Sequence, residues 1–349
     1  LVFSKTSMQF RKISPRNPRA IYFNDNVYVG TVPGGEFIEL ASVDPKLGAV
    51  FYSLDQSDTG APVFKRDQGE CLACHSNGRT KDVPGFVVRS LYTKPDGQPD
   101  FRLGSLTTDH TTPFKNRFGG WYVTGSQGVM RHRGNALISQ NEESRDPIDR
   151  ERGANLKHLP PRVSPDKYLE PTSDLVALML LEHQTQFHNL VTKAGYDCRI
   201  AIYQQSQMNK ILERSPDYRS ESTSRRINKA AEKLLESLLF SNEFPLQSPI
   251  AGSKKFRTEF AANSRKDTKG RSLRDLDLQT RLLRYPCSYL IYTQSFQELP
   301  KDILDRIRQR MMEVLSGEDQ SAAFAHLSSE YRKSFVEILS ATHPLFGDE

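Results

Sequence analysis

The sequence predicts an α+β protein in which a β-rich N-terminal half packs on a mainly helical C-terminal half. Residues 1–140 contain aromatic and β-branched runs separated by glycine and proline, which is typical of short strands. Residues 169–349 instead show the apolar spacing of amphipathic helices. Residues 141–168 are polar, contain proline and lack periodicity, so we expect a linker or surface loop between the halves.

The strands are expected within the first region. Residues 20–32, AIYFNDNVYVGTV, place the turn-forming NDN between two strand-like runs. Residues 36–44 and 48–55 follow as further strands, separated by glycine- and proline-containing breaks. Residues 85–106 are expected to form a hairpin with KPDGQPD as its turn, and residues 119–125 a last short strand bounded by glycines.

The helices are expected in the second region. Thr172 or Ser173 is placed to cap a helix that runs through DLVALMLLEHQTQFHNLVTKA and stops at Gly195. Pro286 and Pro300 suit the first turns of two later helices. The further helices are predicted around residues 200–213, 222–240, 272–283, 287–297, 301–316 and 320–341.

The stretch CLACHSNG, residues 71–78, carries the strongest chemical signal. Cys71, Cys74 and His75 have the Cys-x-x-Cys-His spacing of c-type haem attachment, in which two thiols bind one porphyrin covalently and the histidine ligates its iron. A structural zinc site would need a second ligand pair, and the sequence offers none. A redox dithiol would open a helix after a strand in a βαβ unit, which is also absent. We therefore predict one covalent haem c.

Haem c attachment in bacteria takes place outside the cytoplasm, in an oxidising compartment. The chain begins with Leu1 rather than Met, so we expect that a signal peptide has been removed and that the protein is periplasmic or otherwise extracytoplasmic. Cys198 lies just past the expected helix stop, and Cys287 opens a later predicted helix. A disulfide between them is the prediction, and two buried free thiols are the alternative.

His75 leaves one axial position of the iron open. On a helical wheel of about 100° per residue, His183 lies near the centre of an apolar face, whereas His188 lies about 140° away. His183 is therefore the first candidate for the distal ligand and His188 is not expected to bind. His110, in the polar loop TTDHTTPF, is the second candidate. Met130 and Met179 are thioether candidates, although core packing explains either equally well.

The segment MRHRGN contains three further candidate residues. Arg131 and Arg133 are predicted to pair with haem propionates, or to assist chemistry on bound peroxide if the sixth iron site is open. His132 lies between them as a further candidate distal ligand. His158, in the expected linker, is predicted to be solvated.

Charge and hydropathy limit the partners. The net charge is +6 and the mean hydropathy −0.58, and no apolar run approaches the roughly 18 residues of a membrane span. The densest basic group, residues 254–274, is expected to be a solvated helix edge or a docking face for an acidic redox partner. Nucleic acid is not expected, because no aromatic stacking platform or DNA-reading motif accompanies the charge.

Several segments together resemble a large family of bacterial cytochrome c-like proteins. They are CLACH, DHTTPFKNRFGGWYVTG, LEHQTQFHN, YPCSYLIYTQSF, FNDNVYVG and HLSSEYRKSFVEIL, which are spread over most of the chain. The resemblance implies an exported c-type haem protein and leaves the distal ligand and the reaction open. We expect single-electron transfer by one haem. The alternative is a haem enzyme with an open or displaceable sixth site, peroxidase-like or acting on a small nitrogen oxide, because an electron carrier needs only about 100 residues.

Overall fold

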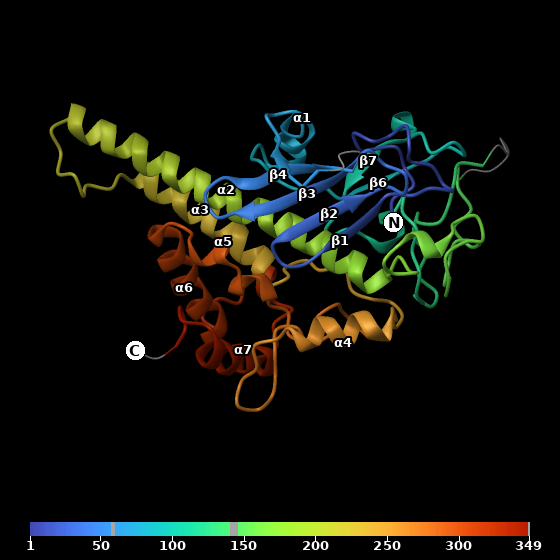
Figure 1. Ribbon diagram of the computed structural model, residues 1–349. Coiled ribbons are helices and arrows are strands. Elements are labelled where there is room, and N and C mark those ends of the chain that lie inside the picture. The colour runs from blue at the N-terminus through green and yellow to red at the C-terminus, as the bar shows by residue number, and fades with distance from the viewer. Residues whose placement is uncertain (57–59, 140–145, 348–349) are drawn as a thin grey trace.

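The computed structural model describes residues 1–56, 60–139 and 146–347, and it confirms the α+β class (Figure 1). Strands lie in the N-terminal half, and the long helices lie in the C-terminal half. The strands are β1 (Ala20–Phe23), β2 (Val27–Thr31), β3 (Phe37–Asp44), β4 (Gly48–Asp55), β5 (Phe64–Arg66), β6 (Arg89–Leu91) and β7 (Ser105–Thr107). The α-helices are α1 (Leu72–His75), α2 (Leu175–Ile211), α3 (Glu221–Leu238), α4 (Lys254–Ala262), α5 (Gln294–Gln297), α6 (Lys301–Ser316) and α7 (Ser329–Thr342).

The main sheet is an antiparallel meander in the order β1-β2-β3-β4-β5. The NDN turn joins β1 to β2 as predicted, because the Asn24 side chain accepts from the backbone N–H groups of Asn26 and Val27. Tyr28, Ala41 and Phe51 are paired across β2, β3 and β4, so their side chains share one face. Tyr28 on that face packs on Phe86, with ring centroids 4.4 Å apart.

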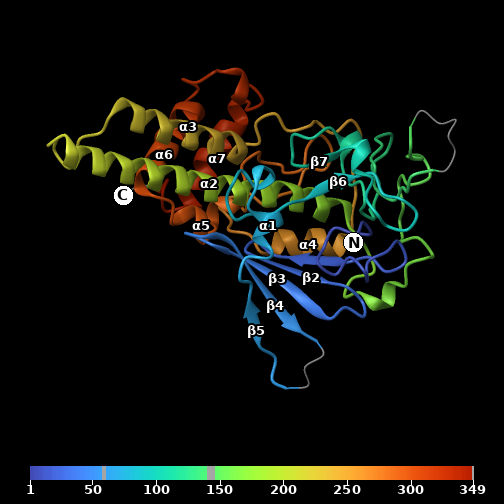
Figure 2. The ribbon, with the colours of Figure 1, turned by 90° about the horizontal axis from the view of Figure 1, so that it is seen from above.

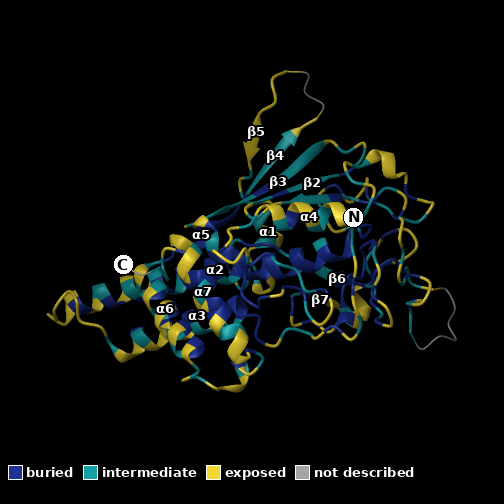
Figure 3. Ribbon diagram, turned by 90° about the horizontal axis from the view of Figure 1, so that it is seen from below, coloured by how far each residue is buried: buried dark blue, intermediate teal, exposed yellow. Residues whose placement is uncertain are grey.

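Helix α2 is the central element of the molecule. Figure 2 shows the sheet on one side of α2 and helices α3, α6 and α7 on the other. Figure 3 shows that the middle of α2 is buried, whereas its far end, with α3, projects from the body. Its first turn is capped by Asp174, which accepts from the N–H of Ala177 at 2.9 Å, rather than by Thr172 or Ser173.

The predicted helix stop at Gly195 is wrong, because α2 continues to Ile211. Gly195 is buried, and a Cβ there would meet the Arg199 guanidinium at 3.0 Å, so the residue serves close packing rather than termination. The residues expected to form a separate helix at 200–213 are the second half of the same helix. Packing against α3 therefore outweighs the helix-ending tendency of one glycine.

Two other predicted helices are replaced by turns. Residues 272–283 form loops in which the Asp277 side chain accepts from the N–H groups of Gln279 and Thr280, so a side-chain turn replaces the helical bonds. Residues 287–297 form only a 3₁₀ turn at Tyr289–Tyr292 and the short α5. Helices α3 and α6 confirm their predictions, whereas α4 and β5 were not predicted.

One hydrophobic core joins the two halves. Its largest cluster includes Phe86 and Trp121 from the N-terminal half and Phe187 and Phe335 from the C-terminal half. The predicted second hairpin is present as the pair β6–β7, but the segment 119–125 makes only isolated bridges. Part of the expected linker, residues 141–145, lies outside the described residues. Across the described part of the chain, no helix is long and apolar enough to cross a membrane.

The predicted disulfide is not formed, since all four cysteines are free thiols. Cys198 lies within α2 rather than past its end, and its side chain is buried in the core. Cys287 is also fully buried. The disulfide prediction was wrong because it assumed that the helix ends at Gly195. The alternative of two buried free thiols is confirmed.

Candidate haem-attachment site

The Cys-x-x-Cys-His residues form the short helix α1 beside the sheet (Figures 1 and 2). The Asp67 carboxylate holds the start of this helix by accepting from the Cys71 N–H at 3.2 Å. Cys71 is half-buried and Cys74 is exposed. Two free thiols three residues apart are thus held on one helical turn at the protein surface.

His75 is held in one tautomer and one orientation. Its Nδ1–H donates to the carbonyl oxygen of Gly85 at 2.9 Å, because a carbonyl can only accept. The Gly85 N–H donates back to the carbonyl oxygen of His75 at 2.8 Å. The Nε2 lone pair is left for another partner. Metal-binding histidines commonly bind the metal through one ring nitrogen, while the other ring nitrogen donates its hydrogen to a carbonyl oxygen.

Helix α2 anchors the segment that orients His75. Asn189 accepts from the N–H of Phe86 and donates to its carbonyl oxygen, each at 2.8 Å. A Cβ at Gly85 would lie 2.3 Å from the Asn189 side-chain oxygen, so only glycine fits between α1 and α2. The Phe51 ring packs on the His75 ring, with centroids 4.8 Å apart. The imidazole is therefore fixed by both the sheet and α2.

The electrostatics of Cys71 weigh against the two rival sites. Burial, followed by the nearby carboxylates of Asp67, Glu39 and Glu70, raises the pKa of its thiol to about 12. A redox dithiol or zinc ligand needs the thiolate, which positive rather than negative neighbours favour. Among residues 1–56, 60–139 and 146–347, no three His, Cys, Asp or Glu side chains converge as metal ligands. The arrangement fits two thiols that become thioethers.

Met8 is a site residue that the sequence did not reveal. Its Sδ lies 4.0 Å from the Sγ of Cys71, and the residue is 52% exposed. Its neighbours are nevertheless fixed, since the Ser7 hydroxyl donates to Glu39 at 2.6 Å and the Gln9 amide donates to the Phe37 carbonyl at 2.9 Å. Met8 lies 63 residues before Cys71. Only the folding of the N-terminal segment across β3 brings them together.

The two histidines proposed as distal ligands lie together in the core. His183 Nδ1 is 3.2 Å from His110 Nδ1, and His183 Nε2 is 2.8 Å from the Ser288 hydroxyl. The Phe240 ring stacks on His183, with centroids 4.1 Å apart. No hydrogen bond or ring contact links either histidine to Cys71, Cys74 or His75 in the described part of the chain. To ligate iron, His183 would have to release one of its two partners.

A buried ion pair adjoins this histidine pair. Arg117 Nη1 lies 3.2 Å from Glu182 Oε2, and its other nitrogens donate to the carbonyls of Thr112 and His110. Burial raises the pKa of Glu182 to about 7, although Arg117 opposes that shift. Burial also lowers the pKa of His110 to about 4 and that of His183 well below its usual value. The histidines are therefore neutral near pH 7.

The helical wheel placed His183 and His188 on different faces of α2, and the structure gives the two side chains different surroundings. His188, not His183, faces the sheet, with its ring 5.9 Å from Phe86 and 6.3 Å from Tyr28. Its Nε2–H donates to the Asp25 carbonyl at 2.9 Å, and its buried Nδ1 has no hydrogen-bond partner among the described residues. Phe86 lies between His188 and the Phe51–His75 pair.

The remaining candidates lie in separate surroundings. Arg131 pairs with Glu151 at 2.7 Å, and Arg133 stacks on the Tyr92 ring at 4.5 Å, so both cations have partners in the folded chain. His132 is buried between phenylalanines and accepts from the Gly134 N–H. His158 is exposed, as expected. Met130 and Met179 are both core residues.

Of the eight basic side chains in the group 254–274, four form ion pairs in the described part of the chain. Arg271 binds Asp267 at 2.6 Å and also pairs with Glu337, and Lys269 binds Glu337 at 2.7 Å. Arg274 pairs with Asp25. These internal ion pairs leave less free positive charge for an acidic partner than the sequence suggested.

Comparisons with protein-family models, with curated proteins and with solved structures found no match for this chain. The assignment of the candidate site therefore rests on the residues of this chain and on their geometry.

Proposed function

We propose that this protein is an exported monohaem c-type cytochrome that transfers single electrons. The observation that carries the proposal is the reciprocal pair of hydrogen bonds between His75 and Gly85. In the described part of the chain no hydrogen bond to Nε2 of His75 is formed, and His75 directly follows two free thiols at haem-attachment spacing. A bound haem c supplies one iron that gains and loses a single electron.

The residues of the chain would have three separate tasks. Cys71 and Cys74 would hold the group covalently, and His75 would ligate it on one side. Gly85 and Asn189 would keep the imidazole in place, so that its geometry changes little between redox states. A rigid ligand set suits electron transfer, because little reorganisation is then needed when the charge changes.

Met8 is the side chain that we propose as the second axial ligand. It combines a thioether, a position next to Cys71 and a half-exposed surface that a bound group would cover. Glu39 supports this placement, because it bonds to Ser7 and also influences the pKa of both Cys71 and His75. Methionine and histidine together would raise the reduction potential above that of a two-histidine site.

The alternative is a haem enzyme with an open sixth site. It is favoured by the length of the chain and by the buried Glu182–Arg117 ion pair. The two functions differ in the coordination of the iron. A six-coordinate, low-spin spectrum supports electron transfer, and a five-coordinate spectrum with ready binding of cyanide supports the enzyme.

The experiment begins with protein matured in a haem c-producing host. Denaturing mass spectrometry should show the mass of one haem on the wild type and none on a Cys71→Ser, Cys74→Ser double variant. A haem removed by acid and acetone, or stoichiometric zinc, would reject the proposal.

The ligand set is tested separately by visible spectroscopy. Met8→Ala should abolish the red absorption band of thioether-ligated ferric haem and lower the reduction potential. Met312→Ala, at an exposed methionine on α6, is the matched control. If haem is attached and the Met8→Ala spectrum is unchanged, only the assignment of Met8 fails.

A further inference from the structure

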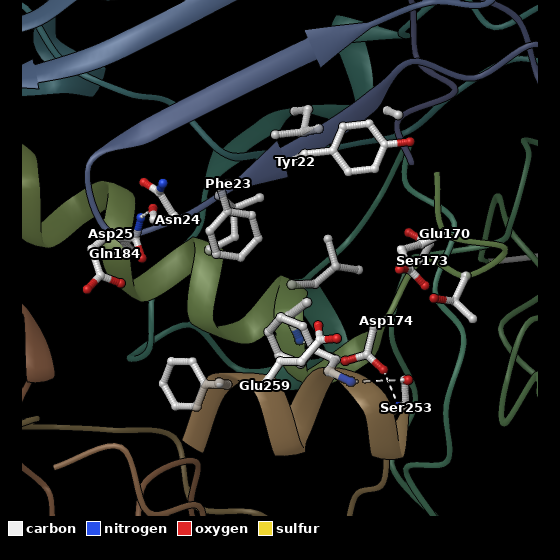
Figure 4. A pocket seen from close by; sticks show the side chains of 18 of the residues that line it. Tyr22, Phe23, Asn24, Asp25, Glu170, Ser173, Asp174, Gln184, Ser253 and Glu259 are labelled. Carbon is white, nitrogen blue, oxygen red and sulfur yellow. Dashed lines mark hydrogen bonds between the residues drawn. The ribbon is translucent and has the colours of Figure 1, made fainter. Parts of the chain in front are cut away.

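A cavity of about 790 Å³ lies between β1, the start of α2 and α4 (Figure 4), and its lining does not include Cys71, Cys74 or His75. Its size is within the range of binding pockets for drug-sized ligands and short peptide segments. Its apolar lining comes from all three elements. The principal apolar residues are Ile21, Phe23, Leu178, Leu181, Phe256 and Phe260.

Strand β1 is an edge strand, and its outer edge borders this cavity. The Asn24 N–H donates to the Val27 carbonyl, so the alternation of antiparallel pairs turns Ala20 and Tyr22 toward β2. The N–H and C=O groups of Ile21 and Phe23 consequently point outward. In the described part of the chain, no hydrogen bond to these four groups is formed.

Two residues before Ile21, at Arg19, the same edge already pairs with another segment of the chain. Val2 and Arg19 exchange two backbone hydrogen bonds, of 2.7 and 2.8 Å, in an antiparallel bridge. Arg19, Ile21 and Phe23 have the same parity along the strand, so the backbone groups of Ile21 and Phe23 point in the same direction as the Arg19 groups that bond to Val2. The edge therefore has the geometry to bind a further extended segment opposite Ile21 and Phe23.

The charges around the cavity favour a basic ligand. Its lining includes the carboxylates of Asp25, Glu170, Asp174 and Glu259 and the cations of Lys255 and Arg274. Asp25 pairs with Arg274, and Glu170 pairs with Lys255. Asp174 accepts from the N–H groups of Ala177 and Ser253 at the start of α2 and α4.

Glu259 is the remaining carboxylate. It is exposed on α4, and no ion pair to it is formed in residues 1–56, 60–139 and 146–347. Nearby, the Arg274 guanidinium is fixed between the rings of Phe260 and Tyr289, at 4.8 and 4.4 Å. The stacked side chains of Phe260, Arg274 and Tyr289 and the carboxylate of Glu259 thus face the unpaired edge of β1.

We propose that this cavity binds an extended segment of a partner polypeptide, which adds to β1 as an antiparallel strand. The backbone of the segment bonds to Ile21 and Phe23, its apolar side chains contact Leu178 and Phe256, and a lysine or arginine pairs with Glu259. A strand edge next to a helix gives affinity through the backbone and selectivity through the side chains. This binding site does not depend on haem attachment.

The test selects short random peptides displayed on phage against the folded chain and then measures the enriched peptide by calorimetry. Enriched sequences should place a lysine or arginine among β-branched or aromatic residues. Glu259→Lys should weaken binding about tenfold or more. Glu213→Lys, at an exposed residue beyond α2, makes the same charge change outside the cavity and should leave the affinity unchanged.

A second measurement tests strand addition itself. N-methylation of the peptide amides that face β1 should abolish binding, whereas methylation of the alternate amides should be tolerated, because only one set can donate to the edge. The proposal is overturned if no peptide is enriched, if Glu259→Lys and Glu213→Lys act alike, or if both methylation patterns have the same effect.

Discussion

His75 and His183 lie in regions that give the ring nitrogens of a histidine different partners. His75 lies on a surface helix, with one ring nitrogen bonded to Gly85 and no hydrogen bond to the other within the part of the chain that the structure describes. His183 lies in the core, with one ring nitrogen facing His110, the other facing Ser288, and Phe240 stacked on its ring. A histidine can accept a new metal partner only where a nitrogen is free and accessible. His183 would first have to release His110 or Ser288 before it could bind a metal.

The largest expected effect separates these two histidines by spectroscopy. His75→Ala removes the free nitrogen, so the haem attached through Cys71 and Cys74 should lose its low-spin spectrum. His183→Ala should retain the wild-type spectrum but reduce the free energy of unfolding by about 2–4 kcal/mol, because it leaves a cavity and unpaired groups on His110 and Ser288. Chemical denaturation followed by circular dichroism measures the second effect.

The reverse result would restore the prediction made from the sequence. If His183→Ala changes the spin state while His75→Ala does not, the haem lies against the histidine pair in the core. A spectral change in His110→Ala would indicate the same region.

Acid should destabilise the folded chain through its buried histidines. Burial lowers the pKa of His110 and His188 to about 4 and that of His132 to about 3. Between pH 6.5 and 4 the unfolded chain therefore binds protons that the folded chain does not, and stability should fall as the pH falls. Glu182 acts in the opposite direction, since its raised pKa makes the folded state gain stability as the pH falls from about 7 toward 4.5.

Asp174, Glu236 and Glu243 also have raised pKa values, but the seven histidines with lowered pKa values outnumber these four carboxylates, so the net loss by pH 4 should be on the order of several kcal/mol. Thermal unfolding measured at intervals of pH provides the check. A melting temperature that stays constant or rises on acidification would show that these histidines titrate normally, and hence that the core is open to water.

The smallest expected effect concerns the link between the two regions. Asn189 on α2 clamps the backbone of Phe86, next to the Gly85 carbonyl that orients His75. Asn189→Ala should cost about 1–3 kcal/mol of stability, because it leaves buried backbone groups unpaired. It should also shift the reduction potential, since the ring of His75 is less firmly oriented. Potentiometry and denaturation measure the two effects.

Asn228→Ala, at an exposed asparagine within α3, is the matched control and should change neither quantity. A loss of stability in Asn189→Ala with an unchanged potential would mean that the clamp is purely structural and that other contacts orient His75.

The sequence by itself determined the features that depend on local patterns. The spacing of Cys71, Cys74 and His75, the NDN turn between β1 and β2, and the ends of α6 all follow from residues close together in the chain. The α+β class was also predictable, because strand and helix periodicities are local properties.

The tertiary structure decided which of these elements meet. The position of Met8 beside Cys71, the clamp of Asn189 on Phe86 and the pairing of His110 with His183 each join residues more than 60 positions apart. Because α2 packs against α3, it continues past Gly195, and Cys198 therefore lies inside the helix rather than near its end. Such contacts depend on how whole surfaces fit together, and no local pattern encodes that fit.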